Sequence, residues 1–210
     1  MKTAILASQN MKKIKEIREI LIKYGMDVIT RDDAGLPRDE IEETGNSFEE
    51  NSLIKAQGVM NMIKADSALL KKYADSPVIA DDSGLMVDAI GGAPGVYSAR
   101  YAGEDGNAEA NNAKLLDELA GVDSDKRGAH FTTVITMLFP EGDMIVAKGE
   151  CHGRIATELR GSGGFGYDPL FIPDGYEQSF AELGTDFKNT ISHRARALAE
   201  LERMLENDGR

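Results

Sequence analysis

The chain has 210 residues, of which 41% are hydrophobic, and this is enough to build the core of a single domain spanning residues 1–210. Acidic residues number 36 against 24 lysines and arginines, so the formal net charge is -12. A protein that binds polymeric nucleic acid normally carries a basic face, so the composition argues against such a partner, and solubility is the simpler explanation of the acidity.

The cysteine content and the apolar runs indicate where the protein works. Cys151 is the single cysteine, so no intramolecular disulfide can form and a reducing compartment is suitable. It lies in the strand-like run MIVAKGECHG, which favours a packed core residue over a catalytic thiol. The first apolar run is too short for a signal peptide, and no run approaches the roughly 20 residues of a membrane span. We therefore expect a soluble, cytoplasmic protein with no membrane partner.

The pattern of apolar residues predicts alternating strands and helices. Short apolar runs predict five strands, at residues 3–7, 27–30, 77–80, 129–139 and 143–152. Apolar residues at helical spacing predict four helices, at residues 11–24, from 47 to beyond 63, 107–120 and 192–206. Gly25 ends the first helix, and Ser47 with Glu50 forms a capping-box pattern at the second. This order predicts an α/β fold with a mixed sheet flanked by helices.

The first predicted helix begins with lysines, where the helix dipole disfavours cations. Lys12, Lys13 and Lys15 lie around its first turn, and each is unfavourable there by a few tenths of a kcal/mol. A phosphate bound at the helix N-terminus would reverse this effect. A solvated basic face is the simpler interpretation of Lys12 and Lys15. Lys13, taken together with Ser8 and Asn10, fits a phosphate site equally well.

The last predicted helix repeats this feature. Ser192-His193-Arg194 places two potential cations at a helix N-terminus, and Lys188 lies just upstream. Arginine offers a fixed fork of donors that suits a phosphate or a carbonyl edge. A lone histidine here would usually cap or pack, but His193 followed by Arg194 makes convergence on an anion more plausible.

Two pairs of adjacent acids provide candidate metal ligands. Asp81 and Asp82 directly follow a predicted buried strand, and Glu42-Glu43 precedes the second helix. Adjacent acids on an exposed turn are usually inert, but acids at the end of a buried strand are costly unless paired or bound to a cation. Hard oxygen ligands without a Cys/His cluster favour Mg²⁺ or Mn²⁺ over Zn²⁺. Cations for phosphates and acids for Mg²⁺ together favour a metal–triphosphate site.

The glycine-rich stretch GSGGFGYDP at residues 161–169 matches neither common nucleotide-binding loop. No glycine loop in the chain ends in Gly-Lys-Ser/Thr, so a P-loop is excluded. The stretch also lacks the strand-then-helix context and the downstream acid of a dinucleotide-binding loop. Pro169 and a further apolar run follow instead.

Six short motifs occur in order along the chain. They are Ser8-Gln9-Asn10-Met11-Lys12-Lys13, Glu42-Glu43-Thr44-Gly45, Ala80-Asp81-Asp82-Ser83-Gly84-Leu85, Gly91-Gly92-Ala93-Pro94-Gly95, Gly163-Gly164-Phe165-Gly166-Tyr167-Asp168-Pro169 and Ile191-Ser192-His193-Arg194. Together they resemble the inosine triphosphate pyrophosphatase family, which removes non-standard purine nucleoside triphosphates. Each motif alone is weak, but all six in this order are specific, and the resemblance spans roughly residues 3–200.

The resemblance implies a fold, an activity and an assembly. The expected fold is α/β, with a long mixed twisted sheet flanked by helices and two lobes around a central substrate cleft. The expected activity is hydrolysis of ITP, dITP and XTP to the monophosphate and pyrophosphate, with Mg²⁺ or Mn²⁺ as the cofactor. The expected assembly is a homodimer.

The resemblance also implies roles for individual residues. The segment Ser8-Gln9-Asn10-Met11-Lys12-Lys13 would bind the substrate, with Ser8, Asn10 and Lys13 on the triphosphate. Glu43 and Asp82 would bind the metal, and Asp82 would also accept the proton of the attacking water. Ser83 would contact the phosphates. The nucleoside side would be formed by Phe165, Gly166, Tyr167, Asp168, Lys188, His193 and Arg194.

These roles move the glycine-rich stretch to the base end of the substrate. We interpret its glycines as letting the backbone close over a flat purine, with Phe165 stacking on the base and Asp168 fixing the corner before Pro169. The alternatives are a regulator that binds nucleotides without hydrolysis, a phosphohydrolase acting on modified pyrimidines or polyphosphate, and a scaffold. A nucleotide panel with pyrophosphate detection, with and without Mg²⁺, separates them.

Overall fold

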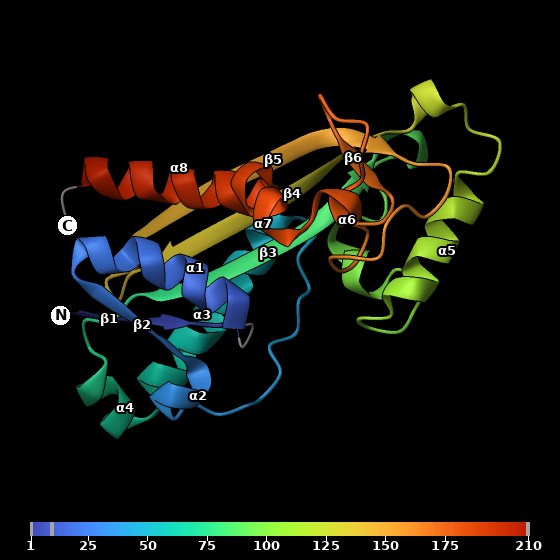
Figure 1. Ribbon diagram of the computed structural model, residues 1–210. Helices are drawn as coiled ribbons and strands as arrows, with labels where there is room; N and C mark the ends of the chain where they lie inside the picture. The colour runs from blue at the N-terminus through green and yellow to red at the C-terminus, as the bar shows by residue number, and fades with distance from the viewer. Residues whose placement is uncertain (1, 9–10, 209–210) are drawn as a thin grey trace. The chain divides into compact units, whose positions relative to one another are not determined.

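The computed structural model describes residues 2–8 and 11–208, with all of their side chains except those of residues 11–13 and 16 (Figure 1). Its strands form one six-stranded sheet in the order β2-β1-β3-β4-β5-β6. They are β1 (Lys2–Leu6), β2 (Met26–Thr30), β3 (Val78–Val87), β4 (Gly128–Leu138), β5 (Met144–Ile155) and β6 (Phe171–Pro173). β1 is parallel to β2 and β3, whereas β5 and β6 are antiparallel, so the sheet is mixed as predicted.

The helices fall into a long set and a short set. They are α1 (Met11–Leu21), α2 (Arg31–Ala34), α3 (Phe48–Ala65), α4 (Ser67–Lys72), α5 (Ala108–Glu118), α6 (Phe180–Leu183), α7 (Thr185–Ile191) and α8 (His193–Asp208). The four helices predicted from the sequence correspond to α1, α3, α5 and α8. The others have seven residues or fewer, too few to show a helical period, so the sequence pattern does not reveal them.

Strand β3 corrects one prediction. The sequence pattern ends this strand at residue 80, before the acids, but the strand continues to Val87 and contains both Asp81 and Asp82. The apolar pattern resumes beyond them, because Leu85 and Val87 are fully buried. The two acids therefore lie within a strand, where successive side chains point to opposite faces of the sheet.

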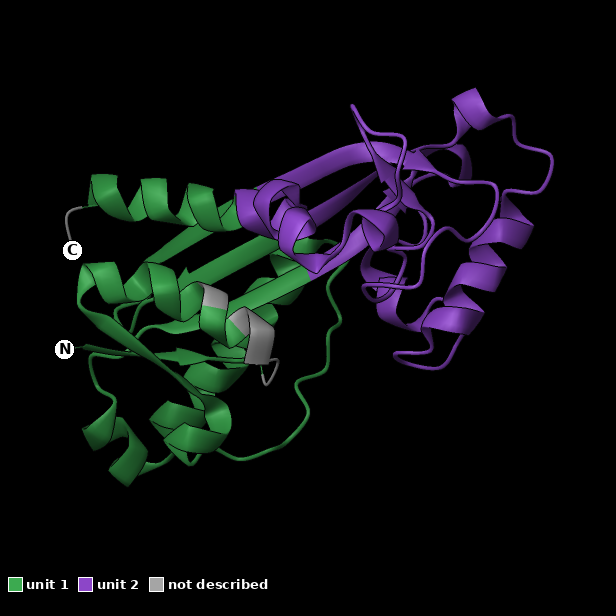
Figure 2. Ribbon diagram, viewed as in Figure 1, with its two compact units in different colours: residues 1–82, 134–148, 197–210 green, residues 83–133, 149–196 purple. Residues whose placement is uncertain are grey.

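The chain divides into two compact units, coloured separately in Figure 2. Unit 1 comprises residues 1–82, 134–148 and 197–210, and unit 2 comprises residues 83–133 and 149–196. Strands β3, β4 and β5 each contribute residues to both units. None of the helices in the described residues is long and apolar enough to cross a membrane.

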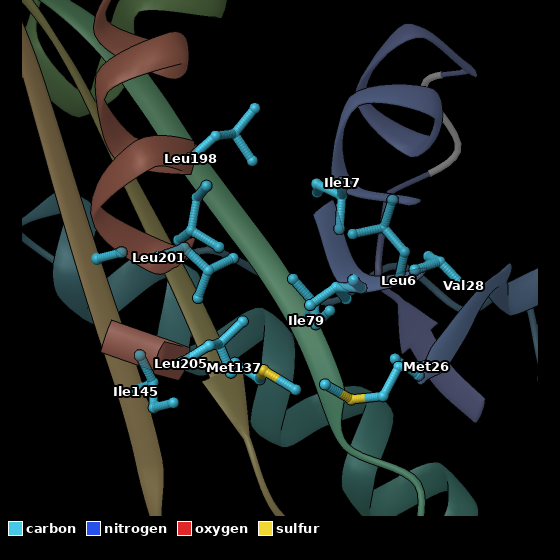
Figure 3. Close-up of a cluster of buried hydrophobic side chains, with 14 of the residues drawn as sticks. Leu6, Ile17, Met26, Val28, Ile79, Met137, Ile145, Leu198, Leu201 and Leu205 are labelled. Carbon is cyan, nitrogen blue, oxygen red and sulfur yellow. The ribbon is translucent and has the colours of Figure 1, made fainter. Parts of the chain in front are cut away.

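Unit 1 packs helices on both faces of its part of the sheet. Leu6 and Ile79 belong to a core that includes apolar residues of α1 and α8, and Figure 3 shows the α8 leucines beside the strand residues. Ile5 and Val78, one position earlier in each strand, belong instead to a core with α3. This alternation follows from the two-residue period of a strand. It places Asp82, like Val78, on the α3 side.

Unit 2 has its own core, which is rich in aromatic rings. Phe131, Phe171 and Phe180 are buried, with ring centroids 4.8 Å apart for the first two and 5.1 Å apart for the last two. Leu115 and Leu119 from α5 and its C-cap pack into the same cluster. Cys151 is also a member and is only 1% exposed, so it is a core residue as predicted.

Candidate active site

The acids of unit 1 converge on a lysine that the sequence analysis does not single out. Lys55 of α3 places its Nζ 2.9 Å from Glu43 Oε2 and 2.9 Å from Asp82 Oδ1. The same ammonium donates to the backbone oxygen of Asp81 at 3.2 Å. All three side chains of the ion-pair group are largely buried, with 20%, 31% and 12% of Lys55, Glu43 and Asp82 exposed. Lys55 is thus the cation that holds the two predicted metal ligands together.

Burial and charge act in opposite directions on this cluster. Burial raises the pKa of the Asp82 carboxyl, the nearby Lys55 ammonium lowers it, and the net result is a pKa above the ordinary value. Burial alone would lower the pKa of Lys55, but its attraction to Asp82 and Glu43 outweighs burial and raises the pKa. Asp82 is therefore a carboxylate whose charge depends on a neighbouring cation.

The donor set suits a hard divalent cation. Asp82 Oδ2 is buried and has no hydrogen-bond partner in the described structure, which is costly for a carboxylate oxygen unless a further cation binds it. No group of three or more His, Cys, Asp or Glu residues in the described part of the chain is arranged to hold a metal. Mg²⁺ is commonly held by one or two carboxylates, with water and substrate phosphates completing its shell. Glu43 and Asp82 fit that arrangement.

Unit 2 contains a cavity of about 260 Å³. Its wall comes from β3, β4, the turn Gly95–Arg100, the start of α5, the glycine-rich stretch, α7 and the start of α8. The wall includes Ser83, Phe165, Gly166, Tyr167, Asp168, Lys188, His193 and Arg194, which are all of the predicted substrate residues that lie in this unit. The sequence places these residues in four separate stretches, and the fold brings them to one cavity.

A buried ion pair fixes one side of this cavity. Lys188 Nζ lies 2.7 Å from both Asp168 carboxylate oxygens, and the two side chains are 8% and 1% exposed. Asp168 Oδ2 also accepts a hydrogen bond from the backbone N–H of Phe165 at 3.0 Å. The Lys188 ammonium lies 4.1 Å from the centre of the Phe165 ring, and Phe165 is 58% exposed. Asp168 thus fixes the corner of the glycine-rich stretch, and Phe165 keeps an accessible face.

The structure explains the glycines of this stretch by close packing within the protein, whereas the sequence suggested that they let the backbone close over a purine. Gly164 has a φ of +80°, and a Cβ there would lie 2.3 Å from Asp168 Oδ2. A Cβ on Gly161 or Gly163 would lie 2.9 Å from backbone atoms of Ala181. These three glycines therefore allow the stretch to pack against the protein itself. Beside Gly166, in contrast, the space where a Cβ would lie is open.

Three further polar side chains of the cavity come from β3 and the start of α8. His193 is buried and stacks on Phe131, with ring centroids 4.8 Å apart and planes 15° from parallel. Arg194 has a buried Nε without a hydrogen-bond partner in the described structure. Ser83 shares a hydrogen bond of 2.9 Å with Thr133 through their hydroxyl oxygens. The cavity thus offers aromatic surface together with an unused guanidinium donor.

The predicted phosphate residues are only partly described. Ser8 follows β1 in unit 1, directly before the undescribed pair. Gln9 and Asn10 lie outside the described residues. Met11, Lys12 and Lys13 form the start of α1, but their side chains are not described. Their predicted roles on the triphosphate therefore stay predictions.

Comparisons with known proteins identify the family of the chain. The sequence profile of the Ham1 family matches residues 4–204. A dITP/XTP pyrophosphatase of Clostridium perfringens is 49% identical over 201 residues, covering 96% of each chain, and one of Bacillus subtilis is 46% identical over 98% of each. The solved Ham1 protein of Staphylococcus aureus is 39% identical and superimposes with a TM-score of 0.86, covering 99% of this chain and 100% of that one. The resemblance seen in the sequence is confirmed.

Proposed function

Because the chain belongs to the Ham1 family, we propose that it hydrolyses non-standard purine nucleoside triphosphates, namely ITP, dITP and XTP, to the monophosphate and pyrophosphate. The observation that carries this proposal is the cavity of unit 2, which is lined by predicted base-side residues from three stretches of sequence together with Ser83. Such an enzyme clears these nucleotides from the pool and is a hydrolase of nucleotide metabolism.

The acids of unit 1 supply the hydrolytic chemistry in this proposal. Water must attack near the α-phosphorus, and pyrophosphate leaves with several negative charges. Mg²⁺ held by Glu43 and Asp82 would neutralise charge on the phosphate oxygens. Asp82 orients the attacking water and accepts its proton, since its raised pKa brings the carboxylate closer to the range of a useful general base.

Two lysines would assist hydrolysis at the phosphate end of the substrate. Lys55 holds Asp82 and Glu43 through its ammonium group, and so fixes the two carboxylates for the metal. Lys13 and the N-terminus of α1 would neutralise the leaving pyrophosphate, with Ser8 and Asn10 as further phosphate ligands. Ser83, which directly follows Asp82 in the chain, would add a hydroxyl contact to the phosphates.

The unit 2 cavity supplies base selectivity. A 6-oxo purine presents an oxygen acceptor, and the buried Arg194 Nε is a donor without a partner in the described structure. Adenine presents an amino donor at the same position, so it would leave that guanidinium unpaired in a desolvated site. Phe165 offers an exposed ring for stacking on the base, and the nearby Lys188 and His193 would help to orient the nucleoside.

A nucleotide panel with direct pyrophosphate detection tests the function. ITP and XTP should give at least about tenfold higher kcat/KM than ATP, a difference of about 1.4 kcal/mol in transition-state free energy. Activity should disappear with EDTA and return with excess Mg²⁺ or Mn²⁺. Comparable rates on ATP, or pyrophosphate release that survives EDTA, would overturn the proposal.

The same proposal extends to location and assembly. A lone buried cysteine suits the reducing cytoplasm, and the family resemblance favours a homodimer. Light scattering coupled to size-exclusion chromatography should give twice the 22.8 kDa mass of one chain. A single-chain mass across the micromolar range would contradict the dimer.

A further inference from the structure

The candidate metal ligand Glu43 lies on an extended segment. Residues 37–46, which we name the strap, connect α2 to α3 without forming a helix or strand (the light-blue stretch between them in Figure 1). An unstructured connection of this length would ordinarily be free to move, so the position of the Glu43 carboxylate depends on whatever holds the strap.

Both ends of the strap are fixed by hydrogen bonds. Arg31 is 8% exposed, and its guanidinium donates to the backbone oxygens of Pro37 and Asp39. At the other end, the backbone N–H of Gly45 donates to Asn51 Oδ1 at 2.8 Å, and Asn51 is 1% exposed. The strap is thus anchored on either side of Glu43.

Alternate residues of the strap meet one face of α3. Side chains at 51, 55, 58 and 62 lie on one helix face, because they are spaced by three or four residues. The strap reaches this face through Gly45 at Asn51, Glu43 at Lys55 and Ile41 at Gly58. Arg31 completes the series by contacting Met62 Sδ at 3.5 Å as well as the strap. The strap therefore follows α3 with about one contact per turn.

Gly58 is the anomaly in this series. Glycine is unfavourable in the interior of a helix, yet Gly58 lies well inside α3. A Cβ on Gly58 would lie 2.8 Å from Ile41 Cδ1 and 3.0 Å from both Ile41 Cγ1 and Cγ2. Ile41 is branched at Cβ and has little freedom to rotate away. Ile41 therefore occupies the space that a side chain at position 58 would fill.

We propose that Gly58 and Ile41 are positioning residues that set where Glu43 presents its carboxylate beside Lys55 and Asp82. Ile41 is two residues from Glu43 in extended chain, so a displaced Ile41 moves the carboxylate with it. The inference rests on the proposed function, since Glu43 matters as a metal ligand there. It adds that the fit of an apolar side chain against a helix glycine controls metal affinity.

The test is a Gly58→Ala variant with a compensating Ile41→Val change. Gly58→Ala should weaken Mn²⁺ binding, measured by electron paramagnetic resonance, by about tenfold and lower kcat on ITP by a similar factor. Its thermal unfolding midpoint should change little, because the better helix propensity of alanine offsets the cost of displacing Ile41. Hydrogen–deuterium exchange of a peptide covering 37–46 should become faster. Adding Ile41→Val removes Cδ1, the closest atom, but leaves Cγ1 and Cγ2, so it should restore part of the lost Mn²⁺ affinity, kcat and exchange protection.

The controls separate this inference from the proposed function. Gln57→Ala changes the adjacent exposed residue of α3 and should leave Mn²⁺ affinity, exchange and activity as in the parent. Unchanged Mn²⁺ affinity and strap exchange in Gly58→Ala would overturn the inference, as would a failure of Ile41→Val to rescue. If the parent enzyme releases no pyrophosphate from ITP, the proposed function fails, while the exchange and Mn²⁺ measurements still decide the role of Gly58 and Ile41.

Discussion

Two lysines, one in each unit, hold carboxylates in opposite ways. Lys55 in unit 1 is shared between Glu43 and Asp82 and leaves Asp82 Oδ2 buried without a partner in the described structure. Lys188 in unit 2 pairs with both oxygens of Asp168, and one of these oxygens also accepts from a backbone N–H.

The difference separates a reactive cluster from a structural one. The Lys188–Asp168 pair is saturated, so it can shape a cavity but has no spare oxygen for chemistry. The Lys55 cluster has two negative charges for one ammonium and an oxygen left over, so it retains capacity for a second cation. The Lys188–Asp168 pair should matter mainly for stability and substrate affinity, and the Lys55 cluster mainly for turnover.

The largest expected effect is the loss of turnover in Asp82→Asn. The amide cannot accept the proton of water and is a poorer ligand for Mg²⁺, so kcat should fall about a thousandfold. The unfolding midpoint should change little, because the amide keeps the size of the carboxyl and Lys55 keeps Glu43 as its counter-ion. Steady-state kinetics on ITP with calorimetry of both proteins measures the two effects.

Glu42→Gln is the matched control for that variant. Glu42 is exposed and adjacent to Glu43, so its change should leave turnover within about twofold. A fully active Asp82→Asn enzyme would show that Asp82 is not catalytic and that the Lys55 cluster is not the reactive one of the two.

The second effect is on stability, in Asp168→Asn. It leaves the buried Lys188 ammonium without its counter-ion, which should cost about 3 kcal/mol of unfolding free energy. Denaturant unfolding measures this cost, and adding Lys188→Met should recover part of it by removing the unpaired charge. A stability loss below about 1 kcal/mol would mean that the pair is not the structural element inferred here.

Particular residues show how far the sequence could predict this molecule. The long strands and helices followed from apolar periodicity, and three of the six motifs contain residues that line the unit 2 cavity, namely Ser83, Phe165–Asp168, His193 and Arg194. The contacts between individual side chains did not follow from the sequence. Asp168 and Lys188 were each predicted as substrate residues, and only the fold shows that they form an ion pair across 20 residues. Hydrophobic periodicity also ended β3 too early, because Asp82 is a polar residue inside a strand.

Lys55 and Gly58 were missed for two different reasons. A lysine in an amphipathic helix looks like a solvated residue, and only the pairing of Lys55 with Asp82, 27 residues away, reveals its role. Gly58 did carry a signal, since a glycine within a long helix contradicts helix propensity. Its explanation needed Ile41, which lies outside any predicted element.

A third effect, on substrate binding, tests the role of the unit 2 cavity. Phe165→Ala removes an exposed ring from the unit 2 cavity and should raise the KM for ITP by about tenfold, within the roughly 1–3 kcal/mol of a base–aromatic stack. Its kcat should remain near the parent value, because the acids of unit 1 are unchanged. Loss of kcat with an unchanged KM would place Phe165 in the chemistry instead of in binding.

The smallest effect, a shift of the pH profile, sharpens the account of the Lys55 cluster. The acid limb of kcat/KM reports the pKa of the essential carboxylate in the free enzyme, which we assign to Asp82. Burial raises that pKa and the Lys55 ammonium lowers it, so Lys55→Met removes the lowering influence. The residual activity of Lys55→Met should therefore have its acid limb at higher pH than the parent. Lys148→Met, which changes an exposed lysine paired with Glu49, should leave the limb in place. A limb that stays still or moves to lower pH in Lys55→Met would show that Lys55 does not control the charge of Asp82.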